Sequence, residues 1–298
     1  MCCFKKKCIF SPKFLYQYKK VSSAKRILEN HAIWLSDPLK FNDPYEGMIN
    51  LIHAENDMQA HRYIQDKVEP LLRKQGVACF GTKADNVLMW AYYAEDQKGV
   101  CIEFDPSKDI IAFENVTPIT YTSNLPQYSI TNEGLDAHKI LSSKSSVWEH
   151  ENECRIIKEE YADRLLTINP RAITGIILGS NSSHFYCDDD PNAKDLLDIF
   201  EMLKRPEYSH IRIKQVQLER DKYKLQINEV PFFVCPRGKM LEIVSMKNQF
   251  ISVQSIDATP VPYYQDKVNK WEHIVLSLSS GKYHIINGKE NAIEVELK

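Results

Sequence analysis

Three glutamates recur at every second position ahead of an arginine, in the order Glu149, Glu151, Glu153 and Arg155. If this segment is a strand, its period of two places all four side chains on one face. Like charges about 7 Å apart repel one another, so a pocket here would raise the pKa of at least one carboxyl group and favour a cationic or polyhydroxyl ligand. The alternative is a solvated edge strand in which Arg155 pairs with a neighbouring glutamate.

Large aromatic rings are concentrated between residues 86 and 94. On a helix, Trp90 and Tyr93 are three residues apart and share a face, which suits either a packed core or a wall on which a planar ligand stacks. Glu103 lies inside the otherwise apolar segment 99–105. A buried carboxylate needs a partner, so Glu103 is unlike its neighbours.

The segment 41–46 reads Phe-Asn-Asp-Pro-Tyr-Glu and directly follows a strand-like segment. Its proline and its Asn42-Asp43 pair predict an irregular, tightly constrained loop. The polar side chains either hydrogen-bond to their own backbone and fix the turn, or project into a cleft. Both alternatives stay open at this point.

The periodicity of the chain predicts an α+β (mixed α/β) fold, with a twisted central sheet and flanking helices. A long amphipathic helix is expected over residues 58–75, with Tyr63, Val68, Leu71 and Leu72 as its buried stripe. After Asn228 the chain becomes short β segments separated by turn signals. We therefore expect a basic tail at 1–12, a core domain at 13–228 and a small β module at 229–298.

Composition excludes several classes of protein. The 298 residues carry 38 basic and 40 acidic side chains, so no overall positive field draws the chain to nucleic acid. The eight cysteines form no Cys-x-x-Cys pair, which disfavours a zinc ribbon or a disulfide framework. Without a signal-like or membrane-spanning apolar run, we expect a cytoplasmic protein with no membrane span. We also expect no metal cofactor.

Five motifs together resemble a bacterial family, the domain of unknown function twenty-nine seventy-one. Its members are similar to this chain in a Leu-Tyr-x-Tyr segment, a Phe-Asn-Asp-Pro-Phe/Tyr-Glu loop, a Leu-Met-Trp helix, a Gly-x-Cys-Ile-Glu-Phe-Asp strand and a Trp-x-x-Glu-x-Glu-x-Arg segment. Here they occupy residues 15–18, 41–46, 88–94, 99–105 and 148–155. Tyr92 and Gln97 stand where the family has histidines, so no general base is assigned there.

The arrangement also resembles ADP-ribosyltransferases in layout, which implies a transferase or glycohydrolase that uses NAD in a toxin or phage-defence setting. A carboxylate beneath the ribose would stabilise the oxocarbenium-like centre, and a second carboxylate would orient or deprotonate the acceptor. The resemblance implies Glu153 and Glu151 for these two roles. Other positions implied for the NAD-binding cleft are Tyr16, Tyr18, Ser36, Asn42, Asp43, Trp90, Tyr93 and Arg155.

Two other functions compete with this hypothesis. One is a non-catalytic binding or sensor protein whose aromatic and acidic cleft recognises a nucleotide-like or peptide ligand. The other is a metal-dependent nuclease with Glu149, Glu151 and Glu153 around a divalent cation. On the ADP-ribosyltransferase-like hypothesis, the partners are a small NAD-like nucleotide and a protein or nucleic-acid acceptor. The sequence gives no oligomeric state.

Overall fold

The structure is a computed structural model of the chain. It describes residues 12–131, 134–182, 191–203, 205–219 and 221–229, together with five strand segments after residue 241. The predicted basic tail lies almost wholly outside the described residues.

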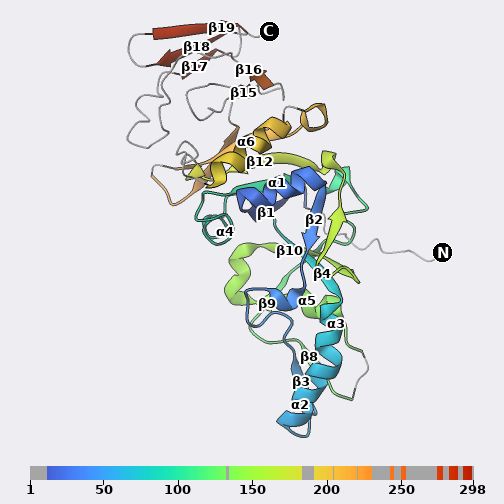
Figure 1. The fold of residues 1–298 in the computed structure, drawn as a ribbon. Helices are drawn as coiled ribbons and strands as arrows, with labels where there is room; N and C mark the ends of the chain where they lie inside the picture. Colours follow the sequence, from blue (N-terminus) through green and yellow to red (C-terminus); the bar gives the residue numbers. More distant parts are fainter. Residues whose placement is uncertain are drawn as a thin grey trace, which may run out of the picture. The chain divides into compact units, whose positions relative to one another are not determined.

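The main sheet has eight strands in the order β14-β13-β12-β5-β1-β4-β10-β6, and most of these strands are labelled in Figure 1. It is mixed, because β12 and β13 run parallel while β10 runs antiparallel to both β4 and β6. This confirms the α+β fold class. The strands are β1 (Leu15–Lys19), β4 (Gln75–Gly81), β5 (Val100–Phe104), β6 (Thr117–Pro118), β10 (Glu153–Glu159), β12 (Ile173–Leu178), β13 (Arg212–Leu218) and β14 (Leu225–Glu229).

The chain divides into two compact units, each built from separate stretches of sequence. Unit 1 comprises residues 1–17, 30–88 and 103–173, and unit 2 comprises residues 18–29, 89–102 and 174–298. Unit 1 also contains three small two-stranded sheets. Their strands are β2 (Ala32–Leu35) with β11 (Arg164–Thr167), β3 (Asn50–Ile52) with β8 (Gln127–Ser129), and β7 (Thr120–Thr122) with β9 (Ser143–Ser145).

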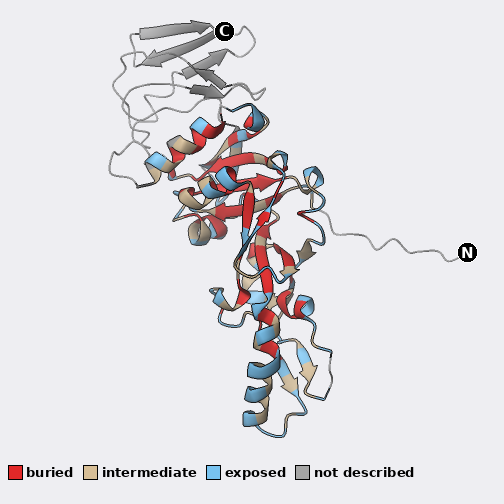
Figure 2. Ribbon diagram, turned by 45° about the vertical axis from the view of Figure 1, so that its right-hand side comes forward, coloured by how far each residue is buried: buried red, intermediate tan, exposed pale blue. Residues whose placement is uncertain are grey.

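The helical segment predicted over residues 58–75 is confirmed in unit 1 as far as residue 73, as α2 (Asp57–Tyr63), the π-helix η2 (Ile64–Val68) and α3 (Glu69–Arg73), whereas Gln75 already begins β4. Val68 and Leu72 are buried in a cluster that includes Leu141 of α5 (Ala137–Leu141), and the other two residues of the predicted stripe pack against it. No residue of α2 is buried, whereas the main-sheet strands β4, β5, β10 and β12 are buried along most of their length (Figure 2).

Gly76 on β4 occupies a place with no room for a side chain. A Cβ added there would lie 2.3 Å from the backbone oxygen of Tyr161. Since backbone cannot rotate away as a flexible side chain can, we expect Gly76→Ala to lower the free energy of unfolding by about 2 kcal/mol or more. Urea unfolding followed by circular dichroism measures this change.

The matched control is Gly134→Ala, because a Cβ at Gly134 would meet nothing within 4 Å. We expect this variant to unfold within about 0.5 kcal/mol of the parent protein. Equal unfolding midpoints for the two variants would contradict the close approach of β4 to Tyr161.

In unit 2, helix α1 (Val21–Asn30) buries Val21, Ala24, Ile27 and Leu28 on one face, and the other helices are α4 (Val87–Tyr93) and α6 (Pro191–Leu203). The tyrosine hydroxyl of Tyr208 donates to the carbonyl of Leu28 at 2.8 Å. On the polar side of α1, the ammonium of Lys25 bridges Asp195 at 2.9 Å and Asp198 at 2.5 Å. One lysine thus binds two partly exposed carboxylates.

The β segments predicted after residue 229 correspond to strands where the structure describes this region. Strand β15 (Glu242–Val244) pairs with β16 (Phe250–Ser252), and β17 (Ile274–Ser277), β18 (Lys282–Asn287) and β19 (Asn291–Glu296) form an antiparallel sheet. Among the described residues, no helix is both long enough and apolar enough to cross a bilayer.

Candidate functional site

Strand β10 carries two of the predicted site residues, Glu153 and Arg155, into the interior of unit 1. It runs between β4 and β6 and is therefore an inner strand rather than the solvated edge considered above. Arg155 is completely buried and the side chain of Glu153 is 3% exposed. Charged groups buried to this degree need partners, so their contacts define what the site can do.

The prediction of one continuous strand from 149 to 155 is wrong for its first half. Residues Ser146–Glu151 form a 3-10 helix, η4, and the strand begins only at Glu153. The hydroxyl of Ser145 caps η4 by accepting from the backbone N–H of Val147, and Asn152 ends it at φ 46° and ψ 50°. Asparagine tolerates this left-handed conformation, which breaks the alternation on which the strand prediction relied.

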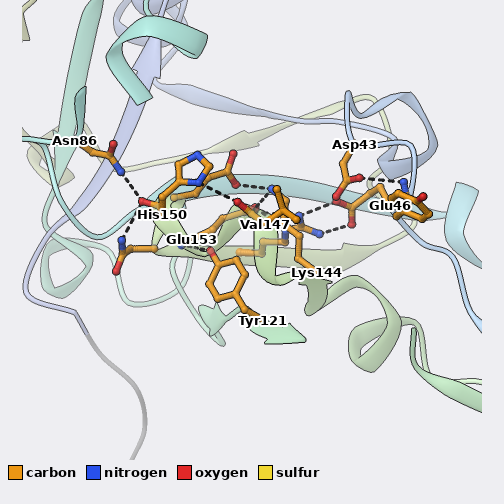
Figure 3. A network of polar contacts seen from close by, with 12 residues as sticks. Asp43, Glu46, Asn86, Tyr121, Lys144, Val147, His150 and Glu153 are labelled. Carbon is orange, nitrogen blue, oxygen red and sulfur yellow. Dashed lines mark hydrogen bonds and ion pairs between the residues drawn. The ribbon is translucent and has the colours of Figure 1, made fainter. Parts of the chain in front are cut away.

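Arg155 binds through every N–H group of its guanidinium. Its Nη1 and Nη2 donate to the two oxygens of Glu46 at 2.6 and 2.9 Å, and its Nε donates to Glu153 at 2.6 Å. Nη1 also donates to the carbonyl of Leu141 at 2.7 Å, and Nη2 to Glu153 at 3.3 Å. Figure 3 shows this network, which fixes the guanidinium between two carboxylates.

Lys144, at the centre of β9, completes the network from the other side. Its ammonium donates to Glu153 at 2.8 Å and contacts Glu151 more closely still, with the lysine side chain 7% exposed. Burial alone would lower the pKa of Lys144, but the charges of Glu153 and Glu151 outweigh it and raise the pKa above its usual value. The lysine is therefore held in its charged form.

The same contacts determine the charge of Glu153. Burial alone would raise its pKa, but the positive charges of Arg155 and Lys144 hold the pKa at about 2. Glu153 is thus ionised throughout the physiological pH range. With Glu46 and Glu151, the network contains three carboxylates and two cations.

Two further groups border Glu153. The backbone N–H of Glu153 donates to the hydroxyl of Tyr121 at 2.8 Å, and burial raises the pKa of that tyrosine to about 12. Cys79 pairs with Arg155 across β4 and β10, where burial and the charge of Glu153 raise the pKa of its thiol well above the ordinary value. A thiol held protonated is a poor nucleophile, so Cys79 is not a catalytic candidate here.

Tyr16 lies in register with Glu153 across the sheet. Tyr16 of β1 pairs with Gly81 of β4, and Gly81 pairs with Glu153 of β10. Directly paired residues point to the same face, so a tyrosine and a glutamate about 10 Å apart flank a position without a side chain. The hydroxyl of Tyr16 donates to Glu103 at 3.3 Å, which gives this buried carboxylate one partner.

The 41–46 loop contributes to the network through a residue that was not singled out. Asn42 is exposed, while Asp43 is 5% exposed and accepts from the backbone N–H of Tyr45 at 3.0 Å. Asp43 thus fixes the turn, and Glu46 at the end of the loop reaches Arg155. Of the two alternatives for this loop, the structure shows the turn-fixing contact for Asp43.

The remaining predicted residues are not among those that make these contacts. Ser36 of unit 1 forms a backbone bridge with Val77, each N–H donating to the other carbonyl at 2.9 Å. In unit 2, Trp90 is 0% exposed and packs edge to face against Tyr18 at 5.2 Å between ring centroids. The rings of Tyr93 and Tyr92 make a similar contact at 6.3 Å. Trp90 is therefore a core ring in this structure and presents no free face for stacking.

Sequence reasoning missed Lys144 and Tyr121 altogether. These two residues are directly paired on the three-residue parallel strands β7 and β9, and the sequence carries no signal for that pairing. Glu46 belonged to a recognised motif, but its partner Arg155 is 109 residues away. No group of three or more His, Cys, Asp or Glu side chains suited to a metal ion occurs in the described part of the chain.

A comparison with protein-family models matches residues 89–156 to the family described as Protein of unknown function (DUF2971). The family resemblance inferred from the motifs is thereby confirmed for this segment, which contains Trp90, Glu103, Glu151, Glu153 and Arg155. Comparisons with curated proteins and with solved structures found no match.

Proposed function

We propose that the chain is an ADP-ribosyltransferase-like protein that transfers ADP-ribose from NAD to an acceptor or hydrolyses NAD. The observation that carries the proposal is the pair Glu151 and Glu153, brought together on one ammonium, with Glu153 held ionised. A permanently charged carboxylate is what a positively charged ribosyl centre requires beneath it. Tyr16, in register with Glu153, supplies a hydroxyl and a ring on the same face of the sheet.

In this reaction the bond between ribose C1′ and nicotinamide N1 breaks, and its electron pair leaves with neutral nicotinamide. Glu153 stabilises the resulting oxocarbenium-like centre. An oxygen or nitrogen nucleophile of water, protein or nucleic acid then attacks C1′, and its proton passes to Glu151 acting as general base. The products from water are nicotinamide, ADP-ribose and a proton.

The test is to incubate the purified protein with NAD labelled in its ADP-ribose part, alone and with candidate protein, DNA and RNA acceptors. We expect label transfer or nicotinamide release by the parent protein and its loss, by about 100-fold or more, in Glu153→Gln. The matched control is Glu149→Gln, because Glu149 lies on the same 3-10 helix but is exposed. Undiminished activity of Glu153→Gln would overturn the assignment.

A specific observation favours a second candidate, a binding protein without chemistry. Both oxygens of Glu153 accept hydrogen bonds from Arg155, and one of them also from Lys144, so most acceptor positions of this carboxylate are occupied and a ribose hydroxyl binds it fully only by displacing one of these donors. A purely structural network needs no such displacement. Stabilisation by a nucleotide that is recovered unchanged after long incubation, measured by thermal shift and chromatography, would support this candidate over the enzyme.

A further inference from the structure

We propose that Lys144 is the positioning residue of this site, fixing the carboxylates of Glu151 and Glu153 in the arrangement that the reaction needs. The inference rests on the proposed function and names a residue that neither the motifs nor the family match assigns to it. In the structure, a single buried ammonium touches both carboxylates, although they belong to different elements, η4 and β10.

The ammonium of Lys144 contacts three neighbouring side chains, two through ion pairs and one through a cation–π interaction. Two neighbours are the carboxylates of Glu151 and Glu153, and the third is the ring of Trp148, whose centroid lies 5.1 Å from the nitrogen. A cation over an indole face is attracted by the ring, which also shields it from water. The ammonium is thus held from three directions and cannot turn to solvent without losing all three contacts.

Because Lys144 is held in its protonated form, its possible chemical roles are limited. A protonated amine has no lone pair, so it neither attacks an electrophile nor forms a Schiff base. It acts through the groups that it binds, by cancelling the repulsion between two carboxylates that share a buried site. Without it, the pair would take up a proton or move apart.

Several titratable or charged groups face this arrangement and would respond to its loss. They are Glu151 on η4, Glu153 and Arg155 on β10, Tyr121 on β7, Cys79 on β4 and Glu46 in the preceding loop. After removal of Lys144, Arg155 remains bound to Glu46 and Glu153, whereas Glu151 loses its contact with Lys144. The added proton is therefore expected on Glu151 or Glu153.

The first test does not require activity and compares Lys144→Met with the parent protein in urea unfolding at several pH values. We expect a large loss of stability at pH 8 that diminishes as the pH falls toward 5, because protonation removes the repulsion between the carboxylates. The double variant Lys144→Met, Glu151→Gln is expected to recover part of the loss at pH 8. A loss that is independent of pH would overturn the positioning role.

Lys25→Met is the matched control, since Lys25 also bridges two carboxylates but its side chain is 20% exposed. Its effect on unfolding is expected to be small and equal across the same pH range. An effect as large and as dependent on pH as that of Lys144→Met would also overturn the proposal.

The second test uses NAD consumption and the conservative variant Lys144→Arg. Because Lys144 touches the carboxylates rather than the ligand, we expect kcat to fall about tenfold or more while KM stays within about twofold. In the same assay, the acid limb of the Lys144→Met profile is expected to move up by about one pH unit. A rise in KM alone would overturn the positioning role, whereas absence of NAD consumption by the parent protein contradicts the proposed function and leaves the stability test to decide on Lys144.

Discussion

Replacing Arg155 with methionine is expected to lower the free energy of unfolding by about 3–5 kcal/mol, the largest stability effect that this structure predicts for a single substitution. The guanidinium is completely buried, and it is bound to both Glu46 and Glu153. Methionine fills a similar volume but removes this cation from Glu46 and leaves Glu153 with its contact to Lys144. Urea unfolding followed by circular dichroism at pH 7 measures the change.

Two comparisons separate charge from shape in this experiment. Arg155→Lys keeps the positive charge but cannot satisfy two carboxylates and a carbonyl from one plane, so we expect it to remain clearly destabilised. Arg73→Met removes an arginine whose side chain is 59% exposed, and its ion pairs are 3.7 and 3.8 Å long. We expect this control to cost less than about 1 kcal/mol. A similar cost at both arginines would contradict the buried network.

The second large effect is the dependence of stability on pH that Glu153 confers. Its pKa is lowered from 4.5 to about 2 in the folded protein, so its contribution is complete above pH 4.5 and is lost as the pH falls from about 4.5 to 2. A shift of this size corresponds to about 3 kcal/mol. We therefore expect the stability difference between the parent protein and Glu153→Gln to be largest near pH 7 and to shrink toward pH 2.

Urea unfolding of both proteins at pH 7, 5, 3.5 and 2.5 gives this difference directly. The exposed carboxylate of Glu149 provides the reference, because Glu149→Gln is expected to leave the difference near zero at every pH. If the parent protein and Glu153→Gln lost stability in parallel on acidification, Glu153 would not be held ionised by Arg155 and Lys144.

Much of the fold was predictable because its strands and helices carry clear local signals. The segment Glu153–Glu159 contains the β-branched pair Ile156 and Ile157, which is typical of a strand, and the stripe around Val68 and Leu72 has helical spacing. By contrast, Glu149 and Glu151 also alternate, yet they lie on a 3-10 helix. Their spacing fits the two-residue period of a strand only by coincidence. The left-handed Asn152 ends the 3-10 helix, and the strand begins after it.

The candidate site was predictable only in part, for a different reason. Glu151, Glu153 and Arg155 were identified because they lie together in the sequence. Lys144 was not, because it joins them only through the pairing of two three-residue strands. Trp90 is the converse case: its ring type left core packing and ligand stacking both open, and its burial against Tyr18 shows core packing in this structure. Residue type alone does not determine exposure.

The left-handed residue Asn152 also places Glu151 and Glu153 on two different elements, so their backbones are held in different ways. Glu153 is anchored in an inner strand whose ladder to β4 runs from Glu153 to Glu159, so its backbone moves only with the sheet. Glu151 is the last residue of a six-residue 3-10 helix, whose end is tied by the carbonyl of Asn152 to the N–H of Thr82 and by the side chain of Asn86 to the carbonyl of His150. The carboxylate of Glu153 therefore has a fixed position in the sheet. The position of Glu151 depends instead on a short helix that two hydrogen bonds hold in place.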